Sequence, residues 1–171
     1  MRYPGGKGKS YHQIINLMPH HNVYIETHLG SGAVLRNKAP SKRSFGIDLD
    51  EKALSMFKDI AVPNLELVRS KAEDFLLAYS FSGDEMVYVD PPYIPETRLR
   101  KKVYRYDYST DDHYNLLKIL VELPCRVIVS GYNNEIYDNY LTGWNKKIFR
   151  AMSHVGLREE CLWFNFDAPK A

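Results

Sequence analysis

The sequence predicts an α/β fold with a mostly parallel sheet, helices on both faces of it, and an antiparallel hairpin near the C-terminus. Apolar runs rich in β-branched and aromatic residues alternate with helix-like segments over most of the chain. This alternation predicts a parallel sheet, because parallel strands need crossover connections. The tail departs from the alternation: two strand-like runs follow one another with only a short turn between them, which is typical of a hairpin.

Each element has a local signal. Five runs are predicted strands, at 23–26, 44–49, 65–68, 86–90 and 126–130. Four segments are predicted helices, at 33–36, 51–59, 72–79 and 112–123, and another helix is predicted to begin near Ser10. The hairpin strands are predicted at 144–152 and 159–166, joined by a turn at 153–156. The connection from Pro91 to about Thr110 is long, and such loops in compact domains are usually functional or mobile.

Length and composition set the general class. With 171 residues, 44% of them hydrophobic, residues 1–171 are expected to form one domain with a full core. A net charge of +2 and a pI near 8.4 are too mild to identify a polyanionic partner by themselves. Cys125 and Cys161 lie far apart in apolar surroundings, so we expect reduced thiols in a cytoplasmic protein. No run has the length of a membrane span or a signal peptide, so no membrane partner is expected.

The most informative motif is Asp90-Pro91-Pro92-Tyr93, which follows an apolar strand. Open α/β sheets bind ligands at the carboxyl ends of their strands. Two consecutive prolines hold the backbone extended and leave carbonyl oxygens as acceptors. A carboxylate, these carbonyls and an aromatic ring suit a planar amine such as the exocyclic amino group of a nucleobase. The ordinary alternative is a proline-rich turn with a capping aspartate.

Two glycine-containing segments suggest close approach of backbone to a ligand. Gly8-Lys9-Ser10 matches the end of a phosphate-binding loop, but Tyr3 stands where the first glycine of that motif belongs, and no strand can precede it. Gly30-x-Gly32 follows the first strand, and Leu35 stands where the third glycine of a dinucleotide-binding fingerprint would be, which disfavours NAD. We expect a nucleoside against this turn.

Several polar residues follow other strands and are expected to reach the same edge of the sheet. Asp48 and Asp50 follow the second strand and could accept hydrogen bonds from ribose hydroxyls. Asp74 and Phe75 follow the third and could contact an adenine ring, although they also fit the acidic first turn of a helix. The segment Ser130-Gly131-Tyr132-Asn133 follows the fifth. His28 is given no chemical role.

The long connection carries basic residues interleaved with tyrosines, in a pattern that favours nucleic acid. Basic side chains neutralise phosphates, and aromatic rings stack on bases at roughly 1–3 kcal/mol per base. A solvated charged loop is the alternative. The predicted nucleic-acid-binding residues are Arg98, Arg100, Lys101, Lys102, Tyr104, Arg105 and Tyr106, with Tyr108 beyond them.

Taken in order, these motifs resemble the Dam-type family of N6-adenine-specific DNA methyltransferases. The tetrapeptide Asp90-Pro91-Pro92-Tyr93 matches the family's catalytic motif without change, and weaker matches extend over almost the whole chain. They are the N-terminal stretch 2–7, the glycine turn, the Gly46-Ile47-Asp48 segment and the final strand from Arg158 to Trp163. The resemblance implies a Rossmann-like methyltransferase that binds S-adenosylmethionine, without a metal, through Tyr3, Gly5, Gly6, Lys7, Glu26, Gly30, Gly32, Asp48, Asp74 and Phe75.

Two departures from the family's pattern bear on substrate and specificity. Thr27-His28 stands where the family has Pro-Phe, and only about a dozen residues separate Asp74 from Asp90, where well-studied members insert a target-recognition domain. Specificity would then come from the loop after Tyr93 or from an oligomeric or separate partner, or it would be weak. The leading hypothesis is methyl transfer to adenine N6 in DNA. The alternatives are methylation of RNA adenine or of a protein amide, and an inactive nucleic-acid-binding module.

Overall fold

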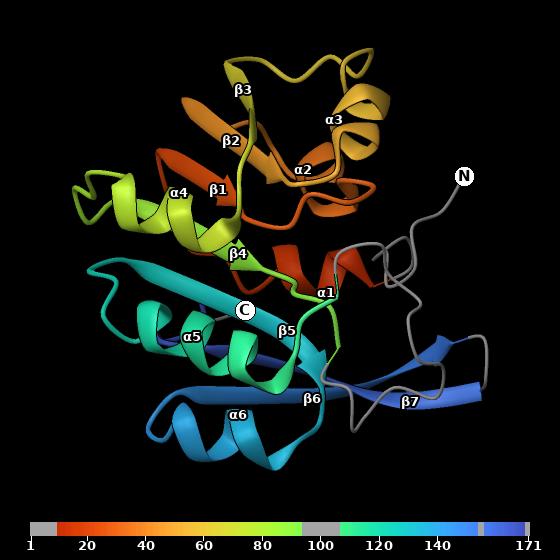
Figure 1. The fold of residues 1–171 in the computed structure, drawn as a ribbon, viewed down its shortest axis with the longest axis vertical. Helices are drawn as coiled ribbons and strands as arrows, with labels where there is room; N and C mark the ends of the chain where they lie inside the picture. The colour runs from red at the N-terminus through yellow and green to blue at the C-terminus, as the bar shows by residue number, and fades with distance from the viewer. Residues whose placement is uncertain (1–9, 94–106, 154–155, 170–171) are drawn as a thin grey trace.

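A computed structural model describes residues 10–93, 107–153 and 156–169, and these contain a seven-stranded sheet of order β3-β2-β1-β4-β5-β7-β6. Strands β1 to β5 pair in parallel, whereas β7 runs antiparallel to β5 and to β6. This arrangement confirms the predicted fold class (Figure 1). The strands are β1 (Val23–Glu26), β2 (Arg43–Asp48), β3 (Leu65–Arg69), β4 (Glu85–Val89), β5 (Arg126–Tyr132), β6 (Asn145–Ser153) and β7 (Gly156–Phe164).

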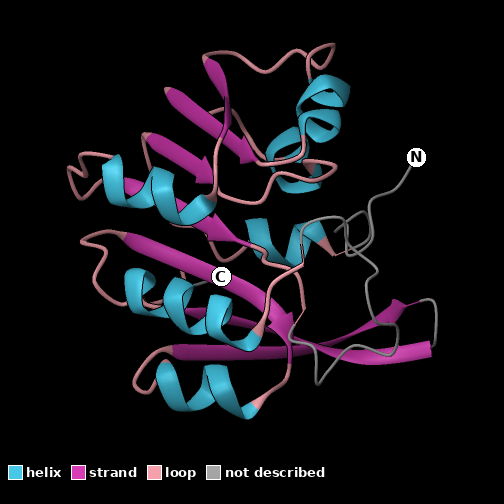
Figure 2. Ribbon diagram, in the orientation of Figure 1, coloured by secondary structure: helices cyan, strands magenta, loops and turns pink. Residues whose placement is uncertain are grey.

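Helices cover both faces of the sheet because alternate strand residues point to opposite sides. In β4, Val87 and Val89 pack in one apolar layer with residues of α4, α5 and α6, which Figure 2 shows in a row across one face. Met86 and Tyr88 pack in the other layer with residues of α1, α2 and α3. The helices are α1 (Tyr11–Ile15), α2 (Ala33–Asn37), α3 (Glu51–Phe57), α4 (Ala72–Ala78), α5 (Thr110–Leu120) and α6 (Glu135–Tyr140).

Side-chain caps set where three of the helices begin. Asp50 accepts a hydrogen bond from the Lys52 amide at the start of α3. Ser109 and Asp112 form a reciprocal capping box on α5, which therefore begins two residues before the predicted start. Helix α6 has no counterpart among the predicted elements, and Asn134 caps it through the Tyr137 amide.

The strand order fixes the place of a ligand site. The order reverses between β1 and β4, which are neighbours in the sheet although two strands separate them in sequence. In doubly wound sheets such a reversal leaves a crevice at the carboxyl ends of the strands. Glu26, Val89 and Tyr132 are the last residues of β1, β4 and β5, so the residues around these positions face that crevice.

The C-terminal hairpin completes the sheet. Strand β7 adds to β5, and β6 forms the outer edge. Ser153 pairs with Gly156, so β7 begins three residues earlier than the sequence predicts. The register sets Tyr132 of β5 opposite Glu160 of β7, which brings a carboxylate from the tail to the site edge.

Candidate active site

Asp90 lies directly after β4, as the sequence predicts, and its carboxylate is held from the neighbouring strand. Ser130 Oγ of β5 donates a hydrogen bond to Asp90 Oδ1 at 2.8 Å. Tyr88 OH lies 2.9 Å from the same Ser130 Oγ. Because a serine hydroxyl has one hydrogen, its donation to the carboxylate means that Tyr88 donates to Ser130. Asp90 thus ends a directed chain of three groups.

The ring of Tyr93 is stacked on the ring of Tyr132. The centroids are 3.9 Å apart and the planes differ by 10°. Tyr93 OH also lies 3.5 Å from Glu160 Oε1, a long contact to a carboxylate that is only 7% exposed. Three elements, the segment after β4, the end of β5 and strand β7, thereby set the orientation of one aromatic ring.

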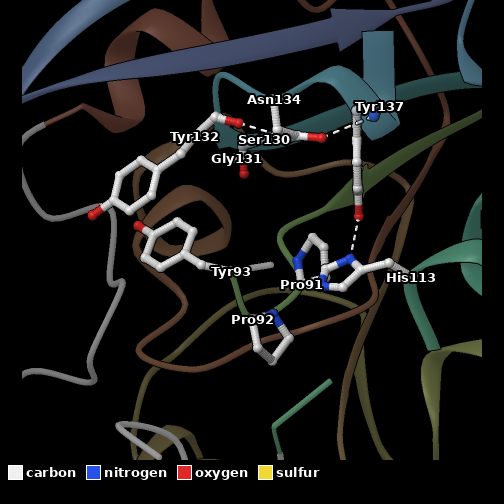
Figure 3. A pocket seen from close by; sticks show the side chains of 9 residues that line it. All are labelled: Pro91, Pro92, Tyr93, His113, Ser130, Gly131, Tyr132, Asn134 and Tyr137. Atoms are coloured by element: carbon white, nitrogen blue, oxygen red, sulfur yellow. Dashed lines mark hydrogen bonds between the residues drawn. The ribbon is translucent and has the colours of Figure 1, made fainter. Parts of the chain in front are cut away.

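A small hollow opens beside these two rings. Figure 3 shows Tyr93 and Tyr132 on one side of it and the His113–Tyr137 pair on the other. His113 Nδ1 and Tyr137 OH are 2.6 Å apart, and both side chains are buried. Burial raises the pKa of Tyr137, and the charge of Asp90 raises it further, so the phenol stays protonated. The lining residues are Pro91, Pro92, Tyr93, His113, Ser130, Gly131, Tyr132, Asn134 and Tyr137.

The glycine turn after β1 meets the acidic end of β2, as the sequence predicts. Gly30 and Gly32 have φ angles of 52° and 67°, which favour glycine. The Gly30 amide donates to Asp48 Oδ2 at 2.9 Å, and the Asp50 amide donates to Asp48 Oδ1 at 2.8 Å. Partial burial raises the pKa of Asp48, while these amide hydrogen bonds lower it. The Asp48 carboxylate is therefore hydrogen-bonded directly to the backbone of the glycine turn.

Glu26, predicted to contact a cofactor, is a buried carboxyl group at the end of β1. Its exposure is 3%, and Oε1 accepts hydrogen bonds from Tyr24 OH at 2.6 Å and from the Leu35 amide at 3.1 Å. Burial raises the pKa of Glu26 to about 8, and the charge of Asp90 adds to the rise. Its contacts therefore tie β1 to α2 beneath the glycine turn.

Asp74 and Phe75 lie in the first turn of α4. Asp74 is exposed. Phe75 stacks on Tyr79 at 5.6 Å between ring centroids and packs against Phe45 of β2 at 5.4 Å. The structure thus brings Asp74 to the surface and ties Phe75 to the apolar layer under the helix.

Hydrogen bonds among Thr27, His28, Tyr108 and Glu73 form a clasp that links three elements. His28 Nε2 lies 2.8 Å from Tyr108 OH, and Tyr108 donates to Glu73 Oε1 at 3.0 Å. Thr27 Oγ1 lies 2.8 Å from His28 Nδ1. Burial lowers the pKa of His28 to about 3, so a neutral imidazole with its hydrogen on Nε2 satisfies all three contacts. The clasp joins the end of β1, the start of α4 and the segment before α5.

The remaining predicted site residues lie outside the described residues. Four of them are predicted cofactor-binding residues, Tyr3, Gly5, Gly6 and Lys7. The others are the predicted nucleic-acid-binding residues Arg98, Arg100, Lys101, Lys102, Tyr104, Arg105 and Tyr106.

Sequence reasoning missed Tyr88, Glu160 and the His113–Tyr137 pair. Tyr88 lies within the predicted strand 86–90, two residues before Asp90, so both side chains fall on one face of that strand. Glu160 and Tyr137 reach the site through the tail and α6, 67 and 24 residues from their partners. No local pattern signals such pairings.

Within the described ranges, no helix is long and apolar enough to cross a membrane. In the same part of the chain, no group of three or more histidine, cysteine, aspartate or glutamate side chains has the arrangement of a metal site.

Comparison with known proteins places the fold. No family model matches the chain, and no curated protein matches it. Among solved structures, precorrin 8W decarboxylase from Methanobacterium thermoautotrophicum matches with a TM-score of 0.64 at 15% identity, covering 96% of this chain and 93% of that one. An rRNA methylase from Streptococcus thermophilus matches with a TM-score of 0.60 at 15% identity, covering 94% and 95%. TrmK from M. capricolum, solved with S-adenosyl-homocysteine, matches with a TM-score of 0.60 at 9% identity, covering 95% and 70%. The chain therefore has the Rossmann-like fold of these three structures.

Proposed function

We propose that the protein transfers a methyl group from S-adenosylmethionine to the N6 amino group of adenine in DNA. The observation that carries the proposal is the position of Asp90-Pro91-Pro92-Tyr93 at the carboxyl end of β4, beside the reversal of strand order, with the Tyr93 ring held in a stack. A carboxylate, proline carbonyls and a fixed ring form a site for a planar amine. The resemblance of the motif to Dam-type enzymes supports adenine.

The described residues fit S-adenosylmethionine. Each oxygen of Asp48 accepts a backbone amide hydrogen, and a carboxylate offers about four lone-pair positions, so capacity remains for a ribose hydroxyl. The glycine turn follows β1 at the carboxyl edge of the sheet, and Gly30, with a φ angle of 52°, has no Cβ there to keep a ligand from the backbone. Binding of S-adenosyl-homocysteine by TrmK, which shares the fold, supports the same cofactor class. The bound cofactor would supply an electrophilic methyl group.

The main catalytic task of the chain is to position the amine. The amino nitrogen of adenine is a poor nucleophile because its lone pair is delocalised into the ring. In the proposal, Asp90 and the Pro91 carbonyl accept the two N6 hydrogens, which localises that lone pair and directs it outward. Transfer would break the methyl–sulfur bond of the cofactor as the N–C bond forms and would leave S-adenosyl-homocysteine. The methylated nitrogen, now acidic, would release one proton to solvent. Alignment of two bound reactants supplies roughly 7–11 kcal/mol of barrier reduction.

Stacking on Tyr93 supports the base outside the helix. Taking an adenine out of duplex DNA costs a few kcal/mol, and stacking on one aromatic ring returns roughly 1–3 kcal/mol. The basic and aromatic residues from Arg98 to Tyr106 are proposed to contact the polymer on the sequence pattern alone, and specificity is proposed to come from them or from a second chain.

The test is transfer of labelled methyl from S-adenosylmethionine to DNA, RNA and a protein extract, with Asp90→Ala assayed alongside. We expect label in DNA from the wild-type chain and none from Asp90→Ala, while calorimetry finds nearly unchanged binding of S-adenosylmethionine by the variant. Full transfer by Asp90→Ala would refute the assignment. Absence of both transfer and cofactor binding in the wild type would favour an inactive nucleic-acid-binding module.

RNA adenine is the second candidate substrate. It is favoured by one observation, the shared fold of an rRNA methylase over 94% of this chain. The chemistry assigned to Asp90 and Tyr93 is the same for either polymer, because both present adenine N6 in the same way when the base is unpaired. Label in RNA and none in DNA would select this candidate.

A further inference from the structure

The end of β5 contacts both groups to which the proposed function assigns chemistry. Ser130 donates to the Asp90 carboxylate, and two residues later Tyr132 stacks on Tyr93. Residues 130 and 132 point to the same face of a strand. One short stretch of a central strand therefore touches the acceptor and the aromatic ring of the tetrapeptide.

The hydrogen bond from Ser130 fixes the carboxylate in one orientation. Ser130 and Tyr88 are each only 1% exposed, so water does not compete strongly for these hydroxyl groups. A donor that serves an ionised acceptor forms a stronger bond than a neutral pair. Since Tyr88 donates to Ser130, the serine hydrogen is directed toward Asp90 Oδ1. The position of the other carboxylate oxygen is set as a result.

The stack of Tyr132 on Tyr93 fixes the plane of the catalytic ring. A base inserted between the two rings would need about 7 Å, twice a van der Waals contact of about 3.5 Å, and the centroids are 3.9 Å apart. Tyr132 therefore occupies one face of Tyr93. Its own backbone is held by pairing with Glu160 of β7. A base that stacks on Tyr93 in this arrangement uses the opposite face.

We propose that Ser130 and Tyr132 are positioning residues for methyl transfer: Ser130 orients the acceptor carboxylate, and Tyr132 presents the Tyr93 ring to the flipped base. This assignment rests on the proposed function. Tyr88 acts through Ser130. Because the acceptor matters in the transfer step and the ring matters in binding the polymer, the two residues affect different kinetic constants.

The test compares steady-state constants of four variants with the wild type. Ser130→Ala is expected to lower kcat roughly 10- to 100-fold at nearly constant nucleic-acid KM, from the value of a hydrogen bond to a charged group. Tyr132→Ala is expected to raise the nucleic-acid KM about 2- to 10-fold, from the value of one aromatic pair, whereas Tyr132→Phe keeps the ring and the wild-type KM. Ser44→Ala is the control, because Ser44 is a buried serine in β2 away from the site.

A double-mutant cycle separates positioning from general loss of structure. Tyr88→Phe alone is expected to lower kcat less than Ser130→Ala does, and adding it to Ser130→Ala is expected to lower kcat no further, because its effect passes through the serine hydroxyl. If the losses of kcat in Tyr88→Phe and Ser130→Ala were additive, Tyr88 would not act through Ser130. If Ser44→Ala lost as much kcat as Ser130→Ala, the positioning role of Ser130 would be overturned. An unchanged kcat in Ser130→Ala with active wild-type protein overturns this assignment alone. A wild-type chain that methylates no polymer overturns the proposed function, and the assignment falls with it.

Discussion

Gly32 offers a sharp test of why glycine stands in the turn after β1. A Cβ placed on Gly32 would lie 2.1 Å from Cε2 and 2.8 Å from Cδ2 of Phe57, which is itself only 1% exposed. The φ angle of 67° adds a backbone penalty. Gly32→Ala should therefore cost roughly 1–2 kcal/mol for the left-handed conformation and about 1–3 kcal/mol for overpacking against a buried ring.

Gly143 supplies the matched control. Its φ angle is 90°, and a Cβ there would meet nothing within 4 Å, so Gly143→Ala should carry only the backbone penalty. Urea unfolding of both variants, with slopes compared to the wild type, measures the difference. We expect Gly32→Ala to lose more free energy of unfolding than Gly143→Ala, and Phe57→Leu to reduce that excess in a double-mutant cycle. Equal losses in the two alanine variants would refute the packing explanation.

Burial raises the pKa of Glu26 from 4.5 to about 8, so the fold favours the protonated carboxyl group. This contribution to stability is full below pH 4.5 and is lost as the pH rises through 8. Glu26→Gln should therefore flatten the pH dependence of the free energy of unfolding between pH 4.5 and 8 by up to about 1.4 kcal/mol per pH unit. Tyr108→Phe removes the donor to Glu73 and should lower the free energy of unfolding, measured in urea, by about 1–3 kcal/mol. A change within experimental error would mean that the clasp does not stabilise the fold. Replacing Lys101 and Lys102, which lie outside the described residues, with alanine should weaken DNA binding and reduce the slope of log affinity against log salt by about 2, and an unchanged slope would place the DNA site elsewhere.

The sheet was predictable because its signals are local. Strands β1 to β5 are apolar runs separated by helical segments, and the structure has them within one or two residues of the predicted bounds. Helix α6 was missed because Glu135–Tyr140 is only six residues long and holds two tyrosines, an aspartate and an asparagine, which have weak helix propensity. It forms where Asn134 caps it and Tyr137 packs in the apolar layer.

The site was predictable to the level of strand ends. Asp90 and Ser130 were both expected at the edge where parallel strands finish, and their contact confirms that these ends converge. The direct contacts were not predictable, since they depend on strand order. The sequence does not state that β4 lies between β1 and β5, nor that β7 brings Glu160 to Tyr93.

For Glu26 the sequence predicts the position but not the role of the side chain. A carboxylate before a glycine turn is a reasonable cofactor ligand in sequence, and the structure shows it with Tyr24 and the Leu35 amide as partners. A buried carboxyl group needs such donors, and burial is a property of the packed fold. A sequence motif therefore identifies a position without distinguishing a ligand contact from a structural one.

The proposed function requires that the methyl group go to the exocyclic nitrogen of adenine held by Asp90. The most direct measurement is mass spectrometry of nucleosides released from DNA and RNA after incubation with the protein and isotopically labelled S-adenosylmethionine. We expect labelled N6-methyldeoxyadenosine from DNA with the wild-type chain and none with Asp90→Ala. A label on cytosine, on a ring nitrogen of adenine or on ribose would contradict it, because none of those positions presents the planar exocyclic amine of adenine to Asp90.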